Sequence, residues 1–238
     1  MNEQFYFRQL LAGRDFAVGD AVATSMRNFT YLLGDRETGD AILVDPAYRP
    51  SELVDMVTAD EMNVVGVVAT HFHPDHIGGT LAGDQHIAGI AELLSLMEVP
   101  VHVQAEEAEW VTARTGVSDD ALTLHHDRDQ LDVGTVAVTL LHTPGHTPGS
   151  QCLLVEGRLL SGDTLFIDGC GRTDFPGGDT LEMYRTLSER LSAVSDETVL
   201  FPGHLYAPES SLSMGLVRAR NYVFAAKSEQ EWLAMFAS

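Results

Sequence analysis

Residues 70–79 read Thr-His-Phe-His-Pro-Asp-His-Ile-Gly-Gly, a stretch that places four potential metal ligands within six positions. Side chains repeat every two residues along an extended chain, so His71 and His73 point the same way and can meet one ion. Asp75 stands where a helix N-cap is expected, which directs Asp75 and His76 toward a second point nearby. Imidazole and carboxylate are ligands of zinc, iron and manganese. The spacing therefore predicts a metal site.

The residues before this cluster predict a buried strand. Residues 64–70 are small or β-branched and show no polar alternation, which is typical of a strand covered on both faces. Such a strand delivers the cluster to the edge of a sheet, where loops converge on a rigid scaffold.

Three further candidate ligands also follow predicted strands. They are His146, Asp163 and His204, after strands expected at 136–142, 158–161 and 198–201. His146 sits in a turn between Pro-Gly elements, which present it rigidly as a third histidine for the first metal. Asp163 is placed to bridge two ions, and His204 completes a second set.

The remaining pattern predicts a mixed α/β chain. Aromatic and branched runs bounded by turn residues favour further strands, and apolar stripes at helical spacing favour helices. Further strands are expected at 5–10, 28–33, 41–44, 101–103 and 151–155, and helices at 51–57, 87–97, 106–115, 209–222 and 229–236. Histidines 86, 102, 125 and 126 have no ligand-like neighbours and are expected to be structural or solvated.

Length and composition limit the function classes. The 238 residues, 45% of them hydrophobic, fit a single domain over 1–238 with a short helical tail from about 205 to 238. Lys and Arg total 14 against 35 for Asp and Glu, a net charge of -21, which argues against a nucleic-acid partner. The chain has no apolar run of membrane-spanning length and no basic-then-apolar start, so a cytoplasmic protein without membrane contact is expected. Exposed C-terminal helices could pair subunits in a homodimer.

These residues together resemble the metallo-β-lactamase superfamily, over about Tyr31 to Tyr206. The resemblance implies an αββα sandwich, in which two mixed β-sheets pack face to face with helices outside and the metals at one rim. It also implies two divalent metal ions, zinc or else iron or manganese. The first would be held by His71, His73 and His146, the second by Asp75, His76 and His204, with Asp163 shared.

Within that superfamily the chain is similar to glyoxalase II, the hydroxyacylglutathione hydrolases. This likeness implies hydrolysis of a small thiol-derived thioester by a metal-bound hydroxide, which Asp75 would orient as a catalytic residue. It also implies that Arg172 and Tyr206 bind the substrate. The C-terminal glutathione-binding domain of that family has no counterpart here, so the thiol carrier stays open.

An alternative is the persulfide dioxygenase branch of the same superfamily, which residues 169–175, Gly-Cys-Gly-Arg-Thr-Asp-Phe, also resemble. That reading implies a single Fe(II) held by His71, His146 and Asp163, and oxidation of a thiol persulfide to sulfite. Two histidines and one carboxylate form the facial triad of non-haem iron oxygenases. A third reading, a metal-dependent structural or sensing module, predicts an incomplete ligand set, whereas every ligand position here is filled.

Overall fold

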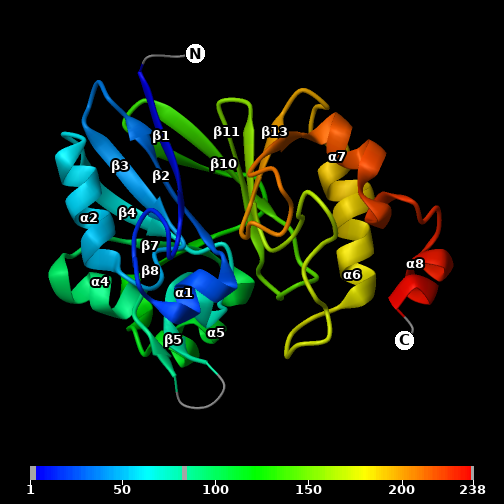
Figure 1. The fold of residues 1–238 in the computed structure, drawn as a ribbon, viewed down its shortest axis with the longest axis horizontal. Helices are drawn as coiled ribbons and strands as arrows, with labels where there is room; N and C mark the ends of the chain where they lie inside the picture. Colours follow the sequence, from blue (N-terminus) through cyan, green and yellow to red (C-terminus); the bar gives the residue numbers. More distant parts are fainter. Residues whose placement is uncertain (1–3, 82–84, 237–238) are drawn as a thin grey trace.

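The computed structural model describes residues 4–81 and 85–236 and contains two six-stranded mixed sheets. Figure 1 shows them side by side at the centre of the molecule, with helices on either side. In spatial order, the first sheet contains β1 (Phe5–Leu11), β2 (Phe29–Asp35), β3 (Asp40–Val44), β4 (Asn63–Val68), β7 (Val101–Gln104) and β8 (Leu122–His125). The second contains β14 (Leu212–Ser213), β13 (Val199–Pro202), β12 (Arg158–Gly162), β11 (Gln151–Val155), β10 (Val136–His142) and β9 (Asp129–Val133).

Both sheets combine parallel and antiparallel pairs. In the first sheet β1, β2 and β3 are antiparallel neighbours, whereas β3, β4, β7 and β8 run parallel. In the second, only β12 and β13 are parallel. A short ribbon of β5 (Gly79–Thr80) and β6 (His86–Ile87) lies apart from both.

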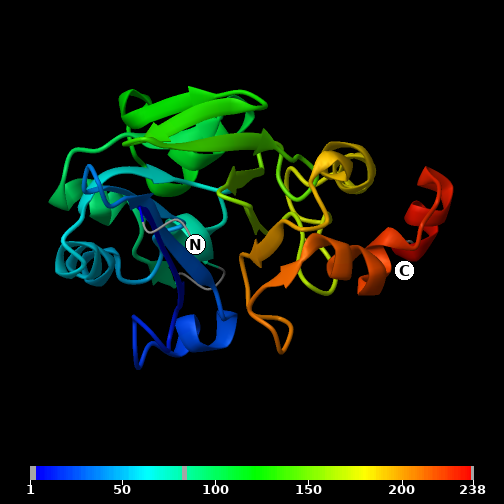
Figure 2. The ribbon, with the colours of Figure 1, turned by 90° about the horizontal axis from the view of Figure 1, so that it is seen from above.

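The helices form the two outer layers (Figures 1 and 2). The first half of the chain supplies α1 (Ala21–Met26), α2 (Pro50–Ala59), α3 (Pro74–Ile77), α4 (Ile90–Leu96) and α5 (Ala108–Thr115). The second half supplies α6 (Thr180–Arg185), α7 (Met214–Arg220) and α8 (Glu229–Phe236). Local chemistry fixes several ends: Asp20 and Asp179 cap α1 and α6 through their carboxylates, and Pro50 occupies the first turn of α2.

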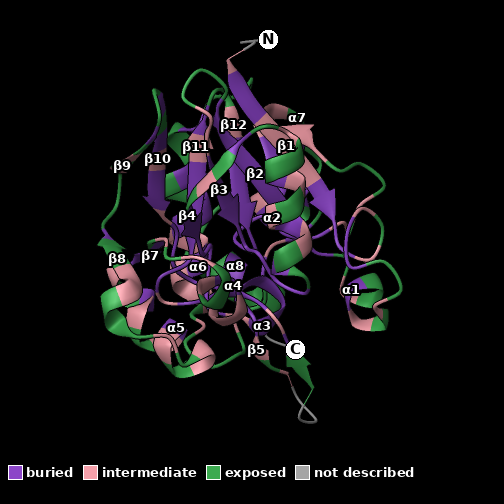
Figure 3. Ribbon diagram, turned by 90° about the vertical axis from the view of Figure 1, so that its left-hand side faces the viewer, coloured by how far each residue is buried: buried purple, intermediate pink, exposed green. Residues whose placement is uncertain are grey.

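Alternate residues of the central strands face two different cores. In β3, Leu43 packs under the helices, while Ile42 and Val44 pack between the sheets. In the second sheet, Leu160 faces the other sheet and Leu159 faces the outer helices. Both faces of the central strands are therefore buried, as the purple colour of β2, β3 and β10 shows in Figure 3. The predicted αββα sandwich is confirmed.

Several local predictions differ from the structure. Asp75 is not an N-cap, because α3 begins at Pro74 and His73 takes that position. The helix expected at 87–97 begins at Ile90, since 86–87 pair in the β5–β6 ribbon. The helix expected at 209–222 is confined to α7, because Leu212–Ser213 pair with β13.

No helix among the described residues is long and apolar enough to cross a membrane.

A buried histidine pair joins β7 to β8. His102 Nδ1 lies 2.9 Å from His125 Nε2, and both residues are at most 9% exposed. Burial, together with the neighbouring His125, lowers the pKa of His102 to about 4, and burial also lowers the pKa of His125. Both rings are therefore neutral in the fold near pH 7. His102 and His125 were expected to be structural or solvated, and both are buried in the fold.

We expect this pair to destabilise the protein in acid. An unfolded histidine titrates near pH 6.5, so the contribution of His102 is fully present above that pH and is lost as the pH falls toward 4. The loss at pH 4 is about 3 kcal/mol for His102 alone. Urea unfolding between pH 7.5 and 4 should show a smaller pH dependence for His102→Gln than for the wild type. The matched control is His126→Gln on the exposed neighbour, and equal pH dependence in all three proteins would contradict the assignment.

Candidate metal centre

The predicted ligands come from four loops at one end of the two sheets. The segment after β4 supplies His71 and His73, and α3 directly behind it supplies Asp75 and His76. The loop between β10 and β11 supplies one histidine, and the turns after the parallel strands β12 and β13 supply an aspartate and a histidine. These last three are His146, Asp163 and His204.

Three of the histidines form the first group. The ligand nitrogens of His71, His73 and His146 all lie within 4.8 Å of one another. His146 Nε2 is 3.0 Å from His73 Nδ1, a close approach of two ring nitrogens. All three side chains point toward the same centre.

The second group contains Asp75, His76 and His204, whose ligand atoms also lie within 4.8 Å of one another. His76 Nε2 is 3.2 Å from His204 Nε2. Asp163 lies between the groups, with Oδ1 3.4 Å from His76 Nε2 and Oδ2 3.7 Å from His146 Nε2. The structure thus brings together every residue that the sequence singled out as a ligand.

Four of the five histidines are held by a hydrogen bond at Nδ1. His76 Nδ1 donates to Asp45 Oδ2 at 2.9 Å, His146 Nδ1 to the carbonyl of Arg172 at 2.6 Å, and His204 Nδ1 to the carbonyl of Met26 at 2.8 Å. His71 Nδ1 lies 3.0 Å from Thr70 Oγ1. These partners favour the tautomer whose Nε2 lone pair faces the centre, as in metal-binding histidines.

The donor atoms fit a divalent cation. His71 Nε2 and Asp163 Oδ1 are buried and have no hydrogen-bond partner among the described residues, which is costly unless another group satisfies them. Burial lowers the pKa of His71, His73 and His146, so these rings are neutral and can donate a lone pair. Divalent metals such as zinc and iron accept this combination of imidazole and carboxylate.

Charge in the second group also favours a cation. Burial lowers the pKa of His76, but the carboxylates of Asp163 and Asp75 outweigh it and raise that pKa well above the usual range. This half of the centre therefore attracts positive charge, which a bound metal ion would supply.

Asp45 orients two of the histidines and was not recognised from the sequence. Its carboxylate accepts from the backbone N–H of Thr70 at 2.7 Å, from Thr70 Oγ1 at 2.6 Å and from His76 Nδ1. Thr70 Oγ1 is in turn free to accept from His71 Nδ1. The only sequence signal was an aspartate before proline at the end of a strand, which is also an ordinary turn pattern.

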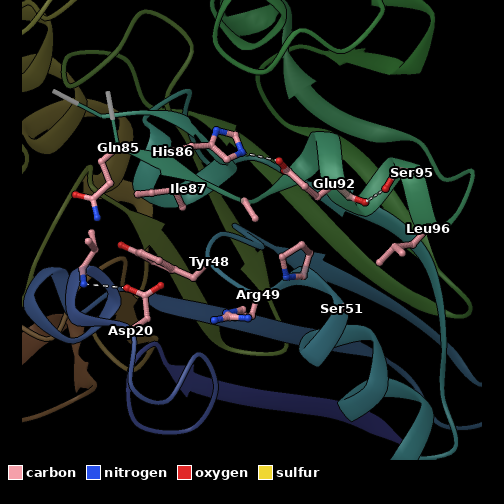
Figure 4. Close-up of a pocket in the computed structure, with 13 residues that line it drawn as sticks. Asp20, Tyr48, Arg49, Ser51, Gln85, His86, Ile87, Glu92, Ser95 and Leu96 are labelled. Carbon is pink, nitrogen blue, oxygen red and sulfur yellow. Dashed lines mark hydrogen bonds and ion pairs between the residues drawn. The ribbon is translucent and has the colours of Figure 1, made fainter. Parts of the chain in front are cut away.

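Asn28 is a second residue that sequence reasoning missed. Its Nδ2 donates to Asp75 Oδ2 at 3.0 Å, and its Oδ1 accepts from the hydroxyl of Tyr48 at 2.7 Å. Tyr48 also borders a hollow of about 450 Å³ between α1, the start of α2 and the β6–α4 segment (Figure 4). That hollow contains none of the clustered ligands.

The two predicted substrate residues lie at a different cavity of about 450 Å³, which opens on His73, His146 and Asp163. The Arg172 side chain is exposed and pairs with Asp174 at 2.6 Å, so its charge is already partly balanced. Tyr206 is 53% exposed and stacks on His204 with ring centroids 4.6 Å apart. Both residues line the cavity, and their substrate role stays a prediction.

The fold and the site together define a class of metal-dependent αββα proteins. The family model described as "Metallo-beta-lactamase superfamily" matches residues 25–204. The chain belongs to this superfamily, whose members are mostly enzymes.

Relatives from two branches are similar to the chain. The persulfide dioxygenase ETHE1 of Homo sapiens is 31% identical over 185 residues, and a probable hydroxyacylglutathione hydrolase of Schizosaccharomyces pombe is 34% identical over 187. Each match covers 75% of this chain but 64% of the relative, less than two thirds of its length. The crystal structure of ETHE1 from Myxococcus xanthus superposes with a TM-score of 0.78 at 27% identity, covering 98% of this chain and 90% of that one.

Proposed function

We propose that the protein is a thioester hydrolase with two metal ions, similar to glyoxalase II. The observation that carries the proposal is the position of Asp163, whose Oδ2 lies 3.7 Å from His146 Nε2 of the first group and 3.3 Å from His204 Nε2 of the second. The first ion would be held by His71, His73 and His146. The second would be held by Asp75, His76 and His204, and Asp163 would be shared between the two ions.

The protein side chains would then position the reactants. Divalent ions bound here would supply Lewis-acid chemistry, lowering the pKa of water toward neutrality and polarising a carbonyl oxygen. Asp75, fixed by the amide of Asn28 at 3.0 Å, would orient the attacking water. The leaving group is a thiolate, which departs without a strong general acid. Arg172 and Tyr206, at the wall of the cavity, would contact the thiol carrier.

The second candidate is a persulfide dioxygenase with one iron held by His71, His146 and Asp163. Its reaction would convert a persulfide, dioxygen and water into a thiol and sulfite. The match to the Myxococcus xanthus structure over 98% of this chain favours it. So does the segment 169–175, which lies against the site through the bond from His146 Nδ1 to the Arg172 carbonyl.

One pair of variants separates the two functions. Zinc-loaded protein would be assayed with S-lactoylglutathione, and anaerobically iron-loaded protein with glutathione persulfide in an oxygen electrode. His204→Gln removes a member of the second group only, whereas His71→Gln removes a residue needed by both readings. We expect the zinc enzyme to hydrolyse the thioester and both variants to lose that activity. Rapid oxygen uptake that survives His204→Gln and disappears in His71→Gln would replace the hydrolase with the dioxygenase.

A further inference from the structure

A second cavity, of about 310 Å³, adjoins the metal centre. It shares His73, Asp75, Met26 and Phe175 with the cavity that Arg172 borders. The two cavities therefore meet at the clustered ligands, so a molecule reacting there can extend into both. Most of its other lining is apolar and includes Phe72, Leu81 and Trp110.

Aromatic rings form the walls of this second cavity. Phe72 and Trp110 stack with ring centroids 4.8 Å apart and an interplanar angle of 24°. Phe175 meets His73 edge-on at 5.7 Å, and it remains 42% exposed. The guanidinium of Arg114 covers the other part of the wall, 5.7 Å from the Phe72 ring. Phe72 itself is 2% exposed, so the open aromatic surface here belongs to Trp110 and Phe175. Aromatic surface left open beside such a centre is typical of ligand sites.

The two cavities differ in chemistry. The one beside Arg172 also contains Asp168, Tyr206 and Cys170, polar groups that suit a charged thiol carrier. The one beside Trp110 offers mainly carbon atoms and ring faces. A thioester has two arms that meet at the reacting carbonyl, one of them the acyl group and the other the thiol.

We propose that the Phe72–Trp110–Phe175 cavity binds the acyl arm of the substrate and that this arm is an apolar group of aromatic size. This inference rests on the proposed hydrolase function and adds the substrate class. A short hydroxyacyl group would leave most of the 310 Å³ to water against apolar walls. A ring in the same place removes that surface from water and gains aromatic contacts.

The cavity contains its own reporter of occupancy. The chain has two tryptophans, Trp110 in this cavity and Trp232 fully buried on α8. Phenylacetate titrated into zinc-loaded protein should change the fluorescence of Trp110 in a saturable way, whereas lactate should not. The change should be absent in Trp110→Phe, which keeps an aromatic ring stacked on Phe72.

Turnover provides the second readout. We expect zinc-loaded protein to hydrolyse S-phenylacetylglutathione with kcat/KM at least about tenfold above S-lactoylglutathione. Phe175→Ala should reduce this preference several-fold with an unchanged melting temperature, because the side chain is partly exposed. Leu216→Ala, an exposed position on α7, is the matched control and should keep the preference.

The outcomes separate this inference from the proposed function. If both thioesters are hydrolysed equally and Phe175→Ala changes nothing, the acyl site is wrong and the hydrolase stands. If neither thioester is hydrolysed but phenylacetate still perturbs Trp110, the hydrolase fails and the cavity remains a site for aromatic groups. No fluorescence response to phenylacetate overturns the cavity assignment itself.

Discussion

Asp163→Ala is expected to remove metal binding and activity together. The carboxylate is 9% exposed and lies among His76, His146 and His204, with Oδ2 3.3 Å from His204 Nε2. Although burial alone would raise it, His204 and His76 hold the pKa of Asp163 well below the usual range. The side chain is therefore a carboxylate, the charged form that binds a cation.

The expected loss of metal affinity is larger than the loss caused by replacing a residue that hydrogen-bonds to a metal ligand. Orienting partners of metal ligands typically contribute 10–100-fold in affinity, and a carboxylate shared between two ions should exceed about 100-fold. Metal content after dialysis and thioester hydrolysis of the same preparation provide the test.

Asp132→Ala is the matched control, because Asp132 is an exposed carboxylate on the edge strand β9 and lines neither cavity at the metal centre. It should retain metal and most of the activity. A fully active Asp163→Ala protein with normal metal content would refute the site assignment, including the two-metal proposal built on it.

The candidate ligands could be predicted from the sequence because their pattern is local. His71, His73, Asp75 and His76 lie within six positions, and each remaining ligand lies in the turn or loop that follows a strand. A polar side chain just after a strand recurs at each of these ligands, and the strand ends meet at one rim of the sandwich. The spacing of ligand-type residues was therefore sufficient to predict most of the metal site.

The residues that orient these ligands could not be found in that way. Asp45 and Asn28 act on side chains 31 and 47 positions away in the sequence. Nothing in their own neighbourhoods distinguishes them from ordinary turn residues. Only the packing of β2 and β3 against the cluster defines their roles.

Two strands, β8 and β9, were not predicted from the sequence, because their residues lack the apolar pattern of the central strands. β8 and β9 are edge strands of the two sheets, and several of their residues are exposed or half-buried. Asp129, Gln130 and Asp132 give β9 a polar composition that is typical of loops, although such residues also protect sheet edges. The central strands were predicted because burial on both faces leaves an uninterrupted apolar run.

Glu107 joins two of the ligand loops, and its replacement is expected to cause the largest loss of stability. The side chain is 1% exposed, and burial raises its pKa to about 7. Its carboxyl group accepts from the N–H of Phe72 at 2.7 Å, from Thr147 Oγ1 at 2.7 Å and from the N–H of Gly149 at 2.6 Å. Phe72 separates His71 from His73, and the other two partners follow His146.

The approach of these loops requires a glycine. A Cβ on Gly149 would lie 2.5 Å from the Cβ of Glu107, closer than two such atoms can approach. The backbone of the His146 loop can therefore pass close to Glu107 only if position 149 is a glycine. Glu107 and Gly149 together hold the loops of the first ligand group in register.

Glu107→Ala leaves the buried N–H groups of Phe72 and Gly149 without an acceptor, and it leaves the Thr147 hydroxyl with Ser150 Oγ as its remaining partner. Each such donor costs about 1–3 kcal/mol, so a decrease of about 3–5 kcal/mol in the free energy of unfolding is expected. Glu107→Gln keeps an oxygen for Phe72 and Thr147 but turns an amide N–H toward that of Gly149, so its loss should be about 1–3 kcal/mol. Zinc affinity should fall in the same order, because the loops that carry His73 and His146 lose their connection.

Urea unfolding of metal-free protein measures the stability term separately from metal binding. Glu106→Ala is the matched control, since that neighbouring side chain is exposed and should change stability by less than about 0.5 kcal/mol. If Glu107→Ala unfolds like Glu106→Ala, the three hydrogen bonds do not hold the loops together. If stability falls while zinc affinity stays constant, Glu107 supports the fold without positioning the first ligand group.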